Sequence, residues 1–184
     1  MAADAFAPVQ LGSLRLRNRV IKTATYEGMC PGGVPSDRLV EFHRTLVAGG
    51  VGMSTVAYCS VSADGRTFAE QMYMRPEVIA PLRRVTDAVH REGGAASLQL
   101  GHCGWFTKNA ELSTRLPRGP SLTFNAYGLS AGKPIALPMS IDEIGAVTQE
   151  FGDAARHARE AGFDAVELHL GHGYLLSQFL CPAT

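Results

Sequence analysis

The sequence predicts an α/β fold of the (β/α)-barrel type, built here from about four βα units. Four short apolar segments alternate with helical patterns, and strands joined through crossover helices pair in parallel. Polar residues lie at or just beyond the carboxyl end of each segment, where the strands of a barrel converge on one site. A doubly wound sheet has the same element order, but no G-x-G-x-x-G motif follows the first strand.

The four strands are predicted from β-branched and apolar runs bounded by loop residues. They are expected at Arg19–Tyr26, Met53–Val61, Ala95–His102 and Ala165–Gly171. The first helix is expected at Asp37–Ala48, where Ser36 supplies a cap and Gly49 ends the helix.

The second and third helices are predicted from apolar spacing. The second begins near Pro76 or Pro81 and ends at Gly93, with Val78, Leu82, Val85 and Val89 on its buried face. The third begins with a capping box of Ser140 and Glu143 and a hydrophobic staple of Met139 and Ile144. It ends at Gly162, and its apolar residues are Ile144, Val147, Phe151, Ala154 and Ala158.

Charge and composition describe an ordinary globular chain of 184 residues, which we expect to form one domain. Lys and Arg number 17, as do Asp and Glu, so the basic excess that nucleic acid or an acidic membrane would require is missing. No apolar run approaches membrane-spanning length. The first residues lack a basic start followed by an apolar core, so we expect no secretory signal. The four cysteines are scattered, which is typical of reduced thiols in the cytoplasm.

The polar residues at or just beyond the carboxyl ends of the predicted strands form the candidate site. They are Thr25 and Tyr26, Tyr58, Gln99 and His102, and finally His169 and His172. Residues three apart on a strand face opposite sides, so His169 and His172 can share a ligand only if the strand ends near Leu170 and the backbone turns, which Gly171 and Gly173 make easy. Two imidazoles could then stabilise negative charge on an oxygen, and Tyr174 could deliver a proton.

Two other interpretations of these histidines remain open. Both rings could be core residues whose nitrogens bond to backbone carbonyls. Alternatively, His102 and Cys103 could join His169 and His172 in a zinc site, although the i, i+4 helical spacing of zincins is missing. We expect no metal.

Gln99 and the long connection Cys103–Met139 also bear on function. Gln99 alternates with Leu98 and Leu100, so its amide points toward the interior and needs partners there, either a flat heteroatom-rich ligand or a neighbouring side chain. A loop as long as Cys103–Met139 is usually functional or disordered. Its place after a strand favours an active-site loop over a solvated excursion.

With these motifs assembled, the chain resembles the Old Yellow Enzyme family of FMN-dependent NAD(P)H oxidoreductases from about Phe6 to its last residue. The similar segments are LGSLRLRNRVIKTATYEGM, GRTFAEQMYM, LQLGHCGW and AGFDAVELHLGHGYLLSQFLCP. The resemblance implies a (β/α)8 barrel with an N-terminal β-hairpin and FMN at the carboxyl face of the strands.

The resemblance also implies roles for individual residues. His169 and His172 would bind the carbonyl oxygen of an α,β-unsaturated substrate, and Tyr174 would protonate Cα after a flavin hydride reaches Cβ. Gln99 would hydrogen-bond the pyrimidine edge of the flavin. The remaining cofactor-binding positions would be Ala24, Thr25, Tyr26 and Tyr58.

The sequence departs from the family pattern at several points. Tyr26 replaces a frequent Thr or Cys, Ala24 a Pro, and Trp105 an Arg. Eight βα units need about 250 residues, so residues 1–184 are expected to form the N-terminal half of a barrel. Exposed strand edges in such a half would favour self-association or pairing with a C-terminal half. The competing interpretation is a non-catalytic half barrel that binds no flavin or acts only with a partner chain.

Overall fold

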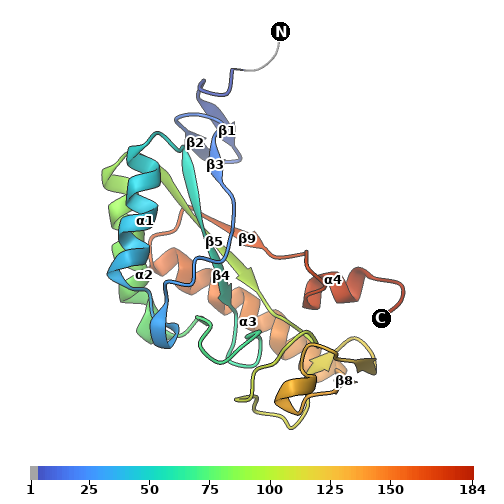
Figure 1. Cartoon of the computed structure of the whole chain (residues 1–184). Helices are drawn as coiled ribbons and strands as arrows, with labels where there is room; N and C mark the ends of the chain where they lie inside the picture. The colour runs from blue at the N-terminus through green and yellow to red at the C-terminus, as the bar shows by residue number, and fades with distance from the viewer. Residues whose placement is uncertain (1–3) are drawn as a thin grey trace.

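A computed structural model of the chain describes residues 4–184, and its centre is a parallel sheet of four strands in the order β3-β4-β5-β9 (Figure 1). The strands are β3 (Ile21–Lys22), β4 (Met53–Ser60), β5 (Ala95–Gly101) and β9 (Ala165–Leu168). The helices that connect them are α1 (Asp37–Ala48), α2 (Pro76–Arg91) and α3 (Ile141–Glu160). This alternation confirms the predicted α/β class.

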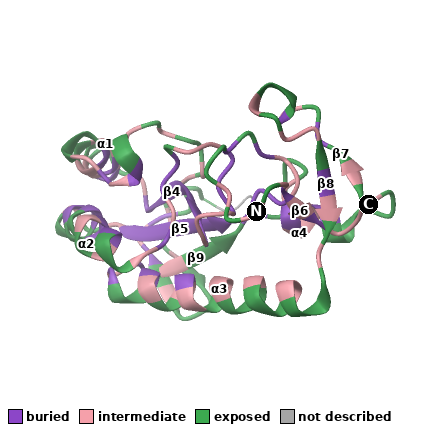
Figure 2. Cartoon of the chain, turned by 90° about the horizontal axis from the view of Figure 1, so that it is seen from below, coloured by how far each residue is buried: buried purple, intermediate pink, exposed green. Residues whose placement is uncertain are grey.

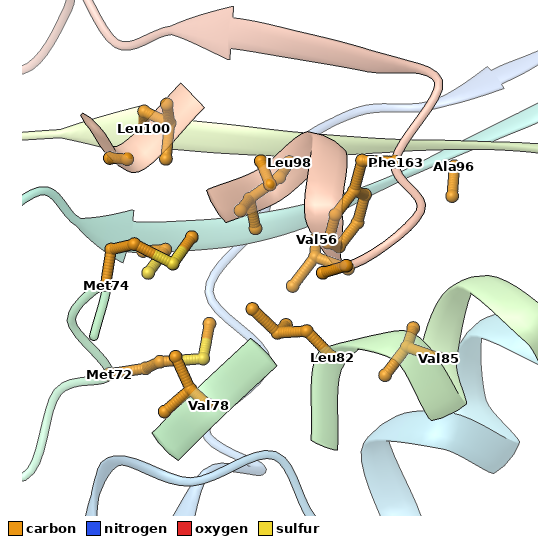
Figure 3. Packing of buried hydrophobic residues seen from close by; sticks show 14 of the residues in the cluster. Val56, Met72, Met74, Val78, Leu82, Val85, Ala96, Leu98, Leu100 and Phe163 are labelled. Atoms are coloured by element: carbon orange, nitrogen blue, oxygen red, sulfur yellow. The ribbon is translucent and has the colours of Figure 1, made fainter. Parts of the chain in front are cut away.

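The hydrophobic core lies between the sheet and these helices. Val56 of β4 and Leu98 of β5 face Leu82 of α2, with Phe163 beside them (Figure 3). Every residue of β4 and β5 is buried, as expected of the two central strands of a parallel sheet. The edge strand β9 differs, because Val166 is 41% and Leu168 51% exposed. Figure 2 shows the same contrast, with central strands in purple and β9 in green and pink.

The helix termini show which local predictions were right. The capping box of α3 is present, because the Ser140 hydroxyl accepts from the Glu143 N–H and the Glu143 carboxylate from the Ser140 N–H. The predicted Ser36 side-chain cap of α1 is wrong. The Ser36 hydroxyl instead donates to the carbonyl oxygen of Met29, seven residues earlier in the loop before the helix.

The first strand is shorter than predicted. Pairing with β4 is limited to Ile21–Lys22, not Arg19–Tyr26, because the chain leaves β4 after Lys22. The other three strands follow the prediction within one to three residues at their carboxyl ends. The expected N-terminal hairpin is present as β1 (Val9–Leu11) and β2 (Leu14–Leu16).

The long connection Cys103–Met139 is folded. It contains β6 (Arg118–Gly119), β7 (Thr123–Phe124), the 3-10 turn η2 (Leu129–Ala131) and β8 (Ile135–Pro138), which form a small sheet in the order β6-β8-β7. This sheet and α4 (Leu175–Leu180) lie at the carboxyl end of the main sheet, opposite the hairpin (Figure 1). A second 3-10 turn, η1, covers Pro31–Gly33. Within residues 4–184, no helix is both long and apolar enough to cross a membrane.

Candidate active site

A cleft of about 530 Å³ opens at the carboxyl ends of the four central strands. Its lining contains eight of the residues that the sequence placed in the site, whereas His102 lies outside it. The lining residues are Ala24, Thr25, Tyr26, Ala57, Tyr58, Thr67, Phe68, Gln99, Phe106, Tyr127, His169, His172 and Tyr174. Parallel strands bring these distant segments to one edge of the sheet, which is where barrels place their active sites.

The two histidines reach this cleft because β9 ends before them. The His169 N–H still bonds to the Leu100 carbonyl of β5, whereas His172 has a positive φ of 59° and Gly173 of 67°. This left-handed turn redirects the backbone, and His172 Nδ1 lies 3.1 Å from His169 Nε2. The predicted turn is therefore present, but the two rings bond to each other.

The hydrogen bonds determine which ring nitrogens carry protons. The Gly171 N–H donates to His169 Nδ1, so in the neutral ring Nε2 is the protonated nitrogen. That N–H faces His172 Nδ1, which leaves Nε2 of His172 as the protonated nitrogen of the second ring. Burial, and secondarily His172, lowers the pKa of His169, which favours the neutral form. The pair thus presents the Nε2–H of His172 as its free donor.

Tyr174 lies beside the histidines and at one end of a chain of hydroxyl groups. Its ring centroid is 4.8 Å from that of His169. The Thr67 hydroxyl lies 3.5 Å from the Tyr174 hydroxyl and 2.6 Å from the Tyr58 hydroxyl, which donates to Gln71 Oε1 at 3.1 Å. Burial raises the pKa of Tyr58 well above its usual value. The Tyr58 phenol is therefore uncharged, and its hydroxyl and that of Thr67 connect Tyr174 to the buried Gln71 through hydrogen bonds.

Gln99 has a partner on the neighbouring strand. Gln99 of β5 is in register with Glu167 of β9, and its Nε2 donates to Glu167 Oε1 at 2.5 Å. Because a carboxylate only accepts hydrogen bonds, this contact fixes which end of the amide is nitrogen. Oε1 of Gln99 has no partner in the described chain, so it remains an acceptor for a ligand N–H.

The segment Ala24–Tyr26 supplies unpaired backbone groups to the cleft. No hydrogen bond within residues 4–184 uses the N–H or C=O groups of these three residues. The Tyr26 side chain is half exposed and meets Phe68 edge to face at 5.5 Å. Burial raises the pKa of this phenol, so the ring is neutral at physiological pH.

The proposed zinc ligands do not come together. His102 is buried away from the cleft, where its Nδ1 accepts from the Gly104 N–H and its ring borders a separate cavity of about 190 Å³. Cys103 is also buried and donates to the Arg66 carbonyl. No group of three metal-ligating side chains occurs in residues 4–184. Trp105, which stands in place of the family's Arg, does not line the cleft either.

Sequence reasoning missed part of the cleft wall. Thr67 and Phe68 belong to the loop after β4, and Phe106 and Tyr127 to the long connection, where their rings stack at 4.5 Å. The quoted motif GRTFAEQMYM contained Thr67 and Phe68 but gave no role to either. Nothing in the local sequence singles out Phe106 or Tyr127. Their presence supports the interpretation of the long connection as an active-site loop.

Comparison with known proteins identifies relatives of this arrangement. Residues 4–184 match the NADH:flavin oxidoreductase / NADH oxidase family. The 4,4'-dithiodibutanoate disulfide reductase of Rhodococcus erythropolis is 44% identical over 178 residues, which are 96% of this chain and 43% of that protein.

Solved structures agree with this match. Morphinone reductase in complex with tetrahydroNAD superposes with a TM-score of 0.87 at 26% identity, over 98% of this chain and 53% of that one. An old yellow enzyme homologue from Zymomonas mobilis gives 0.85 at 26% identity, over 99% and 52%. The predicted family and barrel type are confirmed, and the chain spans about half the length of these relatives.

Proposed function

Because the chain belongs to the NADH:flavin oxidoreductase / NADH oxidase family, we propose that it forms the N-terminal half of an FMN-dependent NAD(P)H oxidoreductase that reduces activated alkenes. The observation that carries the proposal is the single cleft that unites the His169–His172 pair, Tyr174 and Gln99. Each group has a distinct chemical capability there.

The cleft offers hydrogen-bond donors and acceptors of the kind that a flavin ring requires. The backbone of Ala24–Tyr26 offers unpaired N–H and C=O groups, and Oε1 of Gln99 offers an acceptor suited to an imide N–H. Tyr58 would lie along the ring system, as the family resemblance implies. When bound, FMN supplies a hydride that NAD(P)H replenishes.

The histidine pair would bind and polarise the substrate carbonyl. His172 Nε2–H is free to donate, and a small rotation of either ring would release His169 Nε2–H for the same oxygen. Two neutral donors stabilise the negative charge that develops on this oxygen when hydride adds at Cβ. Low pKa values keep imidazoles neutral, and the lowered pKa of His169 agrees with this role.

Tyr174 would complete the reduction by protonating Cα. Its ring packs against both histidine rings, and the Thr67 hydroxyl donates to its hydroxyl oxygen, which leaves the phenol proton of Tyr174 available for transfer. The sum of the two transfers is one hydride at Cβ and one proton at Cα. No oxidation of the protein is required.

The experiment is an FMN titration followed by turnover. The purified chain, alone and within a longer protein that contains it, is mixed with FMN, NADH or NADPH, and either 2-cyclohexenone or 4,4'-dithiodibutanoate. We expect flavin uptake and enone reduction. Disulfide reduction without enone reduction would overturn the alkene assignment. A 184-residue chain that takes up no FMN would favour the competing interpretation of a non-catalytic half barrel that needs a partner.

A further inference from the structure

Strand β3 stops pairing with β4 after Lys22, two residues before Ala24, which lines the cleft. Strand β4 itself continues to Ser60. The register pairs Lys22 with Ser54. In a parallel ladder, the next residue to face β4 would be Ala24, whose N–H and C=O would bond to the Thr55 carbonyl and the Ala57 N–H. Neither bond forms, so two β4 groups need other partners.

Two side chains take the place of those backbone groups. Lys22 Nζ donates to the Thr55 carbonyl at 2.8 Å. The Ala57 N–H donates to the Glu27 carboxylate, at 3.2 Å to Oε2 and 3.4 Å to Oε1. Lys22 and Glu27 also pair with each other. Together they supply one donor and one acceptor, as one strand residue would.

The pair is buried, and His43 lies close to Glu27. The side chain of Glu27 is 4% exposed and that of Lys22 13%. His43 Nε2 lies 3.5 Å from Glu27 Oε1, and its Nδ1 lies 2.7 Å from the Ser54 hydroxyl. A buried carboxylate is costly unless it is paired and hydrogen-bonded, and here both conditions are met.

Ser54, His43 and Glu27 are arranged in the order of a serine–histidine–acid triad, but their burial rules out hydrolysis. Nucleophilic catalysis requires that substrate reach the serine. Ser54 is 1% and His43 0% exposed, beneath the packing of α1 on β4. These three residues therefore do not attack a substrate.

We propose that Lys22 and Glu27 act as a surrogate strand that leaves the backbone of Ala24–Tyr26 free for a cleft ligand. The pair bonds to the Thr55 carbonyl and the Ala57 N–H of β4. Ala24–Tyr26 can therefore present its own N–H and C=O groups to the cleft without leaving those two β4 groups unpaired. Glu27 is thus a positioning residue. The identity of the ligand as FMN rests on the proposed function.

The test combines amide exchange of the flavin-free chain with FMN titration. Glu27→Ala removes the acceptor for the Ala57 N–H, and we expect the Ala57 amide to exchange at least tenfold faster while the Leu98 amide of β5 keeps its protection. FMN binding should weaken at least tenfold. Glu27→Gln retains an oxygen acceptor and should restore most of both properties. Glu41→Gln, on the exposed face of α1, is the matched control and should change neither.

The outcomes separate this inference from the proposed function. Unchanged Ala57 exchange in Glu27→Ala overturns the surrogate strand, and so does an equal loss of protection across β4 and β5. If Glu27→Ala unfolds the chain, failure of Glu27→Gln to protect the Ala57 amide overturns it. If the unmutated protein takes up no FMN, the proposed function fails, whereas the exchange result still decides the role of Glu27.

Discussion

His172 Nδ1 lies 3.1 Å from His169 Nε2, and the Gly171 N–H donates to Nδ1 of the same His169 ring. These two bonds assign both neutral tautomers. They leave His172 as the outer donor of the pair and His169 as the residue that orients it.

Replacement of His172, the outer donor, should destabilise the transition state of alkene reduction. We expect His172→Ala to lower enone turnover about 100-fold, because one donor to a developing oxyanion is lost. Phenol, which mimics an enolate oxygen, should bind more weakly as well. The measurements are steady-state turnover and phenol titration in a protein that contains the complete barrel. His157→Ala, on α3 away from the cleft, serves as the control, and equal turnover in both variants would refute the donor role.

Replacement of Tyr174 should separate the two half-reactions. Tyr174→Phe removes the proton donor, so the alkene half-reaction should slow by about 100-fold or more. Reduction of the flavin by NAD(P)H uses no proton from this residue and should stay within about twofold of the unmutated rate. Stopped-flow absorbance measures both steps, with Tyr73→Phe as the control. An equal loss in both steps would contradict the assignment.

Glu167 should influence cofactor binding through Gln99. The Glu167→Ala substitution removes the carboxylate that holds Gln99 Nε2. We expect FMN affinity to fall about fivefold, which corresponds to one hydrogen bond of about 1 kcal/mol. Titration of flavin fluorescence measures this change. Glu77→Ala at the exposed start of α2 is the control, and unchanged affinity in Glu167→Ala would show that the amide needs no such partner.

The stability of the chain should depend on pH through His102. Burial lowers the pKa of His102 from 6.5 to about 4. Between these values the unfolded chain binds a proton that the folded chain does not, so stability is complete above pH 6.5 and falls as the pH decreases toward 4. The loss is about 3 kcal/mol, from about 1.4 kcal/mol per pKa unit. Urea unfolding at pH 7 and pH 4 should show a smaller difference for His102→Gln. An identical difference in both proteins would disprove the assignment.

The core should be sensitive to the loss of a single side chain from α2. Leu82 is fully buried against the sheet, and Leu82→Ala should destabilise the fold by about 2–5 kcal/mol through lost burial and a residual cavity. Ile141 is 82% exposed, so Ile141→Ala should change stability by less than about 0.5 kcal/mol. Urea unfolding compares the two variants, and similar losses would show that the core is not where the structure places it.

The sequence by itself determined the order of the four central strands and of the helices that connect them, and it identified eight of the residues that line the cleft. Apolar spacing in α2 and the Ser140–Glu143 capping box are local signals, complete within a few residues, and both were right. The convergence of Tyr58, Gln99 and His169 also followed from the sequence, because parallel strands end at one edge.

Only the tertiary structure decided how those groups are connected. The bond between His169 and His172, the Glu167 partner of Gln99, and the early end of β3 depend on contacts between residues brought together by the fold. Local propensity reports on a single segment, whereas a hydrogen bond between segments depends on strand register and on the direction in which each side chain leaves its backbone. For that reason the surrogate pair of Lys22 and Glu27 is visible in the folded chain and not in its sequence.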